Sequence, residues 1–83
     1  MADRPLKLPA LRRCLFQFNV WEDSSRGKGS HTMFFRRLPE GVFGYPIPTH
    51  EKEVRKHYVT GCRRKFRLTP EFGVSDDSFY GPA

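Results

Sequence analysis

Apolar residues near the start of the chain recur with the spacing of a helix. Steps of three or four residues separate them, which predicts an amphipathic helix over residues 8–17. The stripe consists of Leu8, Leu11, Leu15 and Phe18. Pro9 suits the first turn of this helix, where its missing N–H costs no hydrogen bond. Residues 1–5 are mostly polar, and we expect them to be frayed.

Alternating apolar and polar residues predict three strands in the middle of the chain, at residues 18–23, 30–38 and 42–48. The loop 24–29, rich in Ser and Gly, separates the first two strands. A Leu-Pro-Glu-Gly turn at residues 38–41 joins the second strand to the third. Because both connections are short, the sheet should be antiparallel. Pro46 and Pro48 have no N–H to donate, so the second half of the third strand should lie at a sheet edge.

A second helical pattern follows from Glu51, and Thr49 is a candidate cap for it. Its apolar stripe recurs every four residues over about 15 residues. The stripe consists of Val54, Tyr58, Cys62 and Phe66. Gly61 interrupts the pattern but would allow close packing. The opposite face carries Arg55, Lys56, Arg63 and Arg64, with Lys65 and Arg67 at its end. This basic face is either simply solvated or a surface for nucleic acid.

Near the end of the chain, Ser75 followed by two aspartates predicts a short capped turn, and Phe79 and Tyr80 give it an apolar side. The elements together predict one α+β domain over residues 1–83. Its order is α-β-β-β-α, with a three-stranded antiparallel sheet and helices on one face. The other face of the sheet is left to solvent or to a partner.

Composition narrows the classes of partner. The 83 residues carry a formal net charge of +6, with a pI near 9.8. This charge favours a polyanion such as RNA, DNA, an acidic protein or an anionic membrane surface, although it also serves solubility alone. No apolar run approaches the ~20 residues of a membrane span, and the N-terminus lacks an apolar signal core, so we expect a cytoplasmic protein.

The two cysteines, Cys14 and Cys62, lie within apolar patterns, which favours reduced, buried thiols. Zinc binding together with histidines is the alternative. The chain has no CxxC or HxxxH spacing, so we expect no metal site.

The stretch Arg26-Gly27-Lys28-Gly29-Ser30-His31 combines the residue types of a phosphate site. Arg26 and Lys28 suit a phosphate, while Ser30 and the glycine N–H groups are candidate donors to its oxygens. His31 adds an imidazole, the side chain that most often serves as a general acid or base. The alternatives are a flexible glycine turn and an ordinary hydrogen-bonded histidine. Trp21 and Tyr45 would either stack on bases or lie buried.

Several of these motifs together resemble the HicA family, the toxins of HicA–HicB toxin–antitoxin pairs. The likeness runs over roughly residues 8–80. It rests on Leu-Arg-Arg in the first helix, Gly-Lys-Gly-Ser-His31, Pro46-Ile47-Pro48-Thr49-His50 and the tail from Gly73 to Phe79. The chain departs from many members at Thr32, where they carry a second histidine.

The resemblance implies a fold like the double-stranded RNA-binding domain and cleavage of mRNA without a metal, a cofactor or the ribosome. It also implies a HicB-like antitoxin that covers the active site. His31 would be the general acid or base, acting on the ribose 2′-OH or the leaving oxygen. Phosphate and RNA contacts would come from Arg26, Lys28, Gly29, Ser30 and His50. His50 is either an orienting residue or a second proton-transfer group.

Two other interpretations remain open at this stage. One is a double-stranded RNA-binding module without chemistry, for which the basic helical face is the main support. The other is an interaction protein whose positive charge serves an acidic partner, which leaves the Gly-Lys-Gly-Ser-His motif without a role.

Overall fold

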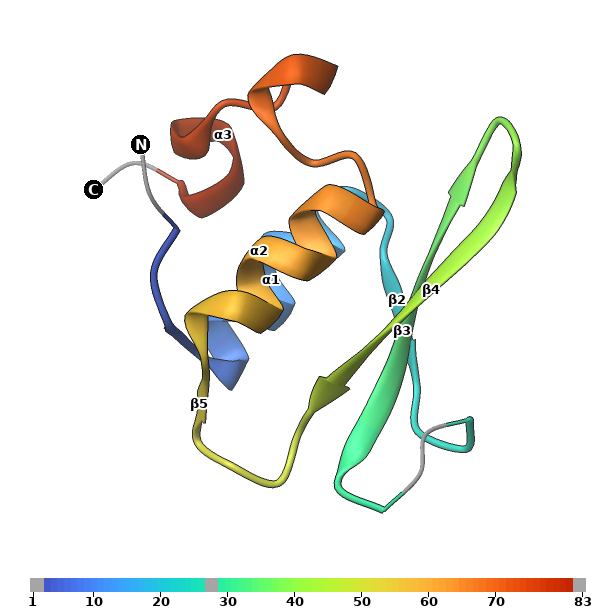
Figure 1. Ribbon diagram of the computed structural model, residues 1–83, viewed down its shortest axis with the longest axis vertical. Helices are drawn as coiled ribbons and strands as arrows, with labels where there is room; N and C mark the ends of the chain where they lie inside the picture. Colours follow the sequence, from blue (N-terminus) through green and yellow to red (C-terminus); the bar gives the residue numbers. More distant parts are fainter. Residues whose placement is uncertain (1–2, 27–28, 82–83) are drawn as a thin grey trace.

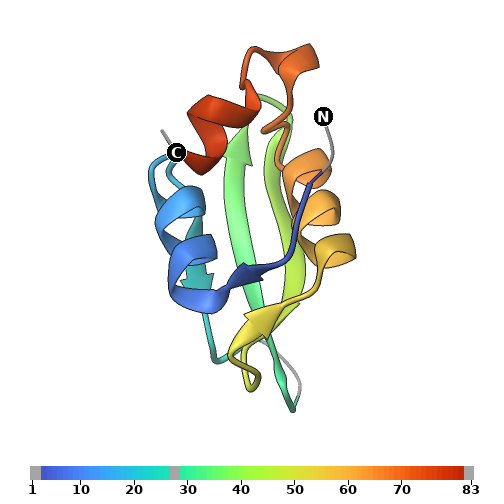
Figure 2. The ribbon, with the colours of Figure 1, turned by 90° about the vertical axis from the view of Figure 1, so that its left-hand side faces the viewer.

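A three-stranded antiparallel sheet forms one layer of the molecule, and the helices form a second layer on one face of it (Figures 1 and 2). The computed structural model describes residues 3–26 and 29–81. The predicted α-β-β-β-α order is confirmed, with small elements added at both ends and one two-residue strand added before the second helix. In chain order they are β1 (Leu6–Lys7), α1 (Leu8–Phe16), β2 (Trp21–Asp23), β3 (His31–Leu38), β4 (Gly41–Pro48), β5 (Glu53–Val54), α2 (Lys56–Lys65), the 3-10 helix η1 (Pro70–Phe72) and α3 (Asp76–Tyr80).

The strand register fixes which side chains face the helices. The sheet order is β2-β3-β4, so β4 is an edge strand, as its prolines predict. Phe34 in β3 pairs with Glu22 in β2 and with Tyr45 in β4. Phe34 is fully buried, Glu22 reaches Arg12 on α1, and Tyr45 packs against Gly61 on α2. This row of the sheet therefore faces the helices.

Helix α1 buries the leucines of its predicted stripe. Of the stripe predicted for the second helix, only Cys62 is buried within α2, because Val54 lies in β5, Tyr58 is half-buried and Phe66 follows the helix. Leu8, Leu11 and Leu15 of α1 are buried together with Phe34 and Ile47 of the sheet. From the C-terminal half, the same core receives Val59, Cys62, Phe66, Leu68 and Phe79. Burying these side chains, at roughly 1.5–3 kcal/mol each, is the main force that holds the two layers together.

Gly61 allows α2 to approach the sheet closely. A Cβ atom at this position would lie 1.9 Å from the Oη atom of Tyr45. No larger residue fits unless Tyr45 moves. The predicted role of Gly61 in close packing is confirmed.

Two predicted element boundaries are wrong. The first strand begins at Trp21 and not at residue 18, because the chain turns after α1 at Asn19, which has a φ of 63°. The second helix begins at Lys56, because Glu53–Val54 form a strand that pairs with Leu6–Lys7. Thr49 does not cap this helix. Its hydroxyl instead forms a 2.8 Å hydrogen bond with the hydroxyl of Thr32.

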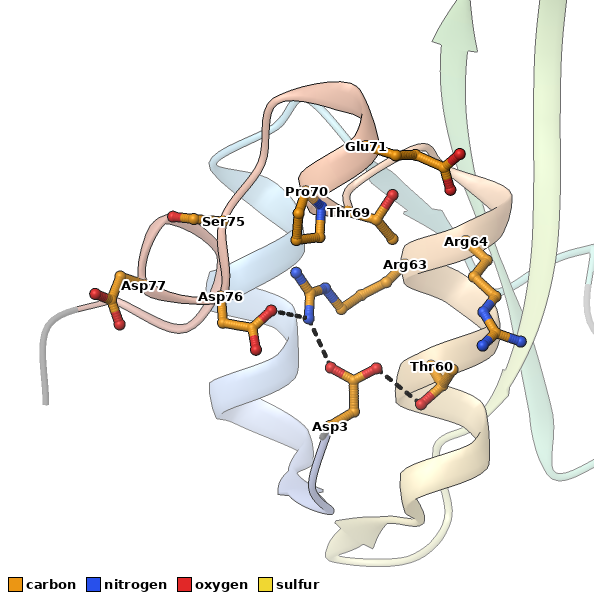
Figure 3. Close-up of a pocket in the computed structure, with 10 residues that line it drawn as sticks. All are labelled: Asp3, Thr60, Arg63, Arg64, Thr69, Pro70, Glu71, Ser75, Asp76 and Asp77. Atoms are coloured by element: carbon orange, nitrogen blue, oxygen red, sulfur yellow. Dashed lines mark hydrogen bonds and ion pairs between the residues drawn. The ribbon is translucent and has the colours of Figure 1, made fainter. Parts of the chain in front are cut away.

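The N-terminal segment is held in place, contrary to the frayed end expected for residues 1–5. The Asp3 carboxylate accepts hydrogen bonds from Thr60 and Arg63 of α2 (Figure 3) and from Tyr80 of α3. Burial by itself would raise the pKa of Asp3, but these hydrogen bonds, from Tyr80, Arg63 and Thr60, lower it below its ordinary value. Residues 1 and 2 lie outside the described residues.

Arg63 does not belong to a solvated basic face, as the sequence pattern suggested. Its side chain is only 3% exposed and forms ion pairs of 2.6 Å with Asp3 and 3.0 Å with Asp76. Its guanidinium also lies over the Phe79 ring, 4.5 Å from the centroid. A buried guanidinium needs such partners to offset the loss of water. Arg63 therefore joins the N-terminal segment, α2 and α3.

Candidate active site

His31 is the first residue of β3, where it pairs in register with Pro48. Its ring is partly buried and lies between two hydroxyl groups. Its Nδ1 atom is 3.2 Å from Ser30 Oγ, and its Nε2 atom is 3.4 Å from Tyr58 Oη. Because each ring nitrogen faces a hydroxyl group, one hydroxyl must move away before the imidazole can exchange a proton with a ligand, while the other continues to orient the ring.

Tyr58 is a site residue that the sequence pattern did not reveal. It comes from the first half of α2, where the helical spacing assigned it to the apolar stripe. The ring is half-buried, as the stripe predicts, but its hydroxyl reaches His31. Its ring also packs against that of His57, with the centroids 4.2 Å apart. The only signal in the sequence was the residue type. A position that faces a core is usually Leu or Val, whereas tyrosine brings a hydroxyl group that needs a hydrogen-bond partner.

The structure brings Ser30, His31 and His50 together. The Ser30 carbonyl accepts a 2.9 Å hydrogen bond from the Thr49 N–H, which holds the two strand ends side by side. The Nδ1 atom of His50 lies 3.4 Å from the same carbonyl oxygen. His50 is exposed, so it stands at the rim of the site. Its contact with the Ser30 backbone supports a role in orienting the loop or a substrate.

The loop before His31 is described only in part. Gly29 has a φ of 58°, a backbone conformation that glycine adopts without strain. A Cβ atom there would meet no neighbour, so glycine is favoured by the backbone and not by close packing. Gly27 and Lys28, two predicted phosphate contacts, lie outside the described residues. Arg26 is exposed and interacts with Asp23 at 3.7 Å. Its guanidinium lies 6.0 Å from the centroid of the Phe35 ring. The described contacts of Arg26 thus involve β2 and β3 and not the His31 ring.

A basic groove runs along α2 beside the tyrosine. The cavity, of about 540 Å³, is lined by Arg55, Lys56, His57, Thr60, Gly61 and Arg64. We refer to these six residues as the α2 groove. Its charged lining is entirely basic, and the side chains of Arg55, Lys56 and Arg64 are exposed. His57 connects the groove to the site through its contact with Tyr58. Such a surface attracts the phosphates of a nucleic acid.

A larger cavity, of about 650 Å³, contains none of the predicted site residues (Figure 3). Four carboxylates line it, from Asp3, Glu71, Asp76 and Asp77, against the two guanidinium groups of Arg63 and Arg64. Asp3 and Asp76 are already paired with Arg63. An anionic substrate would be repelled there, so this cavity is a poor candidate for the phosphate site that the sequence predicts.

Metal and thiol chemistry receive no support from the geometry. Within residues 3–26 and 29–81, no three His, Cys, Asp or Glu side chains are grouped so as to hold a metal ion. Cys14 and Cys62 are both buried free thiols. Burial raises the pKa of Cys62 to about 12, which keeps this thiol protonated and unreactive at neutral pH.

None of the described helices has the length and apolar character to cross a membrane.

No family model matches the chain, and neither curated proteins nor solved structures give a match to it. The case for a function therefore rests on the residues and their geometry.

Proposed function

We propose that this protein is an endoribonuclease toxin of a type II toxin–antitoxin pair, similar to HicA, with His31 as the general acid or base. The observation that carries the proposal is the position of His31. Its partly buried imidazole lies between the Ser30 and Tyr58 hydroxyl groups, and Tyr58 connects it to the α2 groove. The order of the elements is compatible with the double-stranded RNA-binding-domain-like fold that the sequence motifs imply.

The proposed reaction uses the nucleophile that RNA itself carries. The 2′-OH attacks the adjacent phosphorus, the bond from phosphorus to the 5′-oxygen breaks, and a cyclic phosphate and a free 5′-OH result. His31 either removes the 2′-OH proton while water protonates the leaving 5′-oxygen, or protonates that oxygen while water takes the 2′-OH proton. The exposed cations of the α2 groove hold the RNA backbone, and Ser30 contributes a hydroxyl at the reacting phosphate. Tyr58 is a positioning residue, because it acts on the imidazole through its hydroxyl. The scheme requires no metal ion.

The proposed partners are mRNA as substrate and a HicB-like antitoxin that covers the active site, both in the cytoplasm. The substrate and the antitoxin are what the resemblance to HicA implies, and the Gly-Ser-His31 and Pro46-Ile47-Pro48 motifs carry that resemblance. The positive charge of the chain, formally +6, supports an anionic substrate.

Expression in a bacterial host tests the proposal. The wild-type chain should arrest growth and deplete mRNA, whereas His31→Ala should be tolerated at the same protein level. Coexpression of the neighbouring reading frame should restore growth if that frame encodes the antitoxin. Equal toxicity of the wild-type and His31→Ala chains would overturn the role of His31.

The α2 groove favours one alternative, a duplex RNA-binding module without chemistry. Its cations lie along a single helix, as expected of a surface that contacts phosphates across a groove of the duplex. Binding of duplex RNA without cleavage of any RNA, even at high protein concentration, would select this alternative.

A further inference from the structure

The face of the sheet that points away from the helices carries an apolar and aromatic surface. The register that turns Phe34 toward the helices turns its neighbours on β3, Met33 and Phe35, to the opposite side. Trp21 pairs directly with Phe35, and the two rings lie 5.8 Å apart at 30°. We refer to Trp21, Met33 and Phe35 as the outer patch. Trp21 is 41% exposed there, although an indole is usually largely buried.

Gly44 allows the outer patch to lie flat on the sheet. It pairs with Phe35 on the outer face of β4. A Cβ atom at Gly44 would lie 2.8 Å from the Phe35 ring and 3.0 Å from the end of the Met33 side chain. The Phe35 ring therefore extends across the neighbouring strand, where a side chain would otherwise stand.

Charge around the outer patch is mainly positive. The Arg26 guanidinium lies 6.0 Å from the Phe35 ring centroid, and Arg37 follows Phe35 on the same side of β3. The carboxylate on this face is that of Asp23, which already interacts with Arg26. Proteins that bind single-stranded nucleic acids commonly do so with exposed aromatic rings flanked by arginines. The rings stack on unpaired bases, and the arginines attract the phosphate backbone.

We infer that the outer patch binds the unpaired bases of single-stranded RNA. The strand that carries Phe35 begins at His31, four residues away, which is roughly 13 Å along an extended strand. An RNA strand whose bases stack on Trp21 and Phe35 thus reaches the imidazole within a few nucleotides. This inference rests on the proposed function for its substrate and names that substrate as single-stranded.

Trp21 supplies the test, because it is the only tryptophan of the chain. In the His31→Ala background, which prevents turnover, the fluorescence of Trp21 is followed during titration with a single-stranded uridine oligonucleotide of about ten nucleotides, a typical site size. We expect saturable quenching, and much weaker quenching by a duplex of the same length. Trp21→Ala, followed by anisotropy of a labelled oligonucleotide, should bind roughly tenfold more weakly, and Trp21→Phe should retain most of the affinity.

Phe16→Ala is the matched control, because Phe16 is 45% exposed but belongs to α1 in the helical layer. It should bind the oligonucleotide like the parent protein. Wild-type affinity in Trp21→Ala, an absence of quenching, or equal quenching by the duplex would overturn the inference. So would a Trp21→Ala protein that loses self-association in sedimentation but keeps its affinity for RNA.

The two proposals fail separately. If Trp21→Ala binds RNA normally while His31→Ala abolishes cleavage, the inference that the outer patch binds RNA is wrong and the proposed nuclease activity is supported. If single-stranded RNA quenches the fluorescence of Trp21 but the wild-type protein cleaves no RNA, the proposed nuclease activity is wrong and the inference that the outer patch binds RNA is supported.

Discussion

His31 and Tyr58 are 27 residues apart in the sequence, yet the Nε2 atom of the histidine lies 3.4 Å from the Oη atom of the tyrosine. The contact exists because α2 packs closely on β4, which pairs with β3 at His31. The helix that supplies the basic groove therefore also supplies a hydroxyl group to the imidazole. In the proposed function, this one pair joins the surface that binds RNA to the group that transfers the proton.

Removal of the Tyr58 hydroxyl should lower the rate of RNA cleavage while RNA binding is retained. A hydrogen bond contributes about 0.5–1.5 kcal/mol net, so Tyr58→Phe should reduce the rate by up to roughly tenfold. The pH profile of cleavage should also move, which a purely structural role would not produce. Tyr45→Phe is the matched control, because its hydroxyl meets Gly61 and not His31. An unchanged rate and pH profile in Tyr58→Phe would remove it from the site.

The α2 groove should account for part of the salt dependence of RNA binding. Arg64→Ala should weaken binding and reduce the slope of log affinity against log salt by about 0.7, the value for one phosphate contact on a single strand. Arg13→Ala is matched to it, because both arginines are exposed in the last turn of a helix, and Arg13 belongs to α1. Equal effects of the two substitutions would indicate nonspecific attraction by net charge.

Gly61→Ala should destabilise the protein even though alanine is the better helix former. The gain in helix propensity is about 1 kcal/mol, whereas overpacking costs about 1–3 kcal/mol and the added Cβ meets the Tyr45 ring. Urea denaturation should show a net loss of about 1 kcal/mol. Arg64→Ala on the same helix should stay within about 0.5 kcal/mol of the wild type. A more stable Gly61→Ala protein would mean that α2 does not approach the sheet as closely as described.

The Asp3→Asn protein should unfold at a lower urea concentration than the wild type. The buried Arg63 guanidinium and the Tyr80 hydroxyl both donate to the Asp3 carboxylate, and the substitution removes the charge that accepts these two hydrogen bonds. The expected cost is about 2 kcal/mol, since Asp76 still pairs with Arg63. Asp77→Asn is the control, because Asp77 is exposed in the same acidic cavity.

The free energy of unfolding at low pH tests the ion pair between Asp3 and Arg63. The folded pKa of Asp3 lies below its ordinary value of 3.8, so its carboxylate stabilises the fold fully above that pH. This contribution is lost as pH falls through the folded pKa. The difference in stability between wild type and Asp3→Asn should therefore shrink on acidification below 3.8. A difference that persists undiminished at the lowest pH would show that the charge of Asp3 is not responsible.

The elements that the sequence predicted well are those in which one periodicity extends over a long segment. The leucine stripe of α1 and the alternation around Phe34 are examples. The two-residue strands β1 and β5 escaped prediction because two residues carry no period. Val54 is buried in β5, but its four-residue spacing to Tyr58 matched a helix by coincidence.

Contacts between distant parts of the chain could not be predicted. Arg63 looked like a surface cation because its partner Asp3 is 60 residues away. Tyr58 looked like a core residue for a similar reason. Ser30, His31 and His50 lie together because β3 and β4 are adjacent antiparallel strands, so the start of one meets the end of the other. The exposure of Trp21 depended on the register of β2, which a three-residue strand does not reveal.

The most direct test of the proposed chemistry compares purified wild-type and His31→Ala proteins on a single-stranded RNA in the presence of a chelator. We expect wild type to cleave the RNA, and His31→Ala to do so at least roughly 100-fold more slowly, as expected for loss of a general acid or base. Both proteins should unfold at similar urea concentrations, because the His31 ring is only partly buried. Cleavage by the folded His31→Ala protein at the wild-type rate would contradict the account.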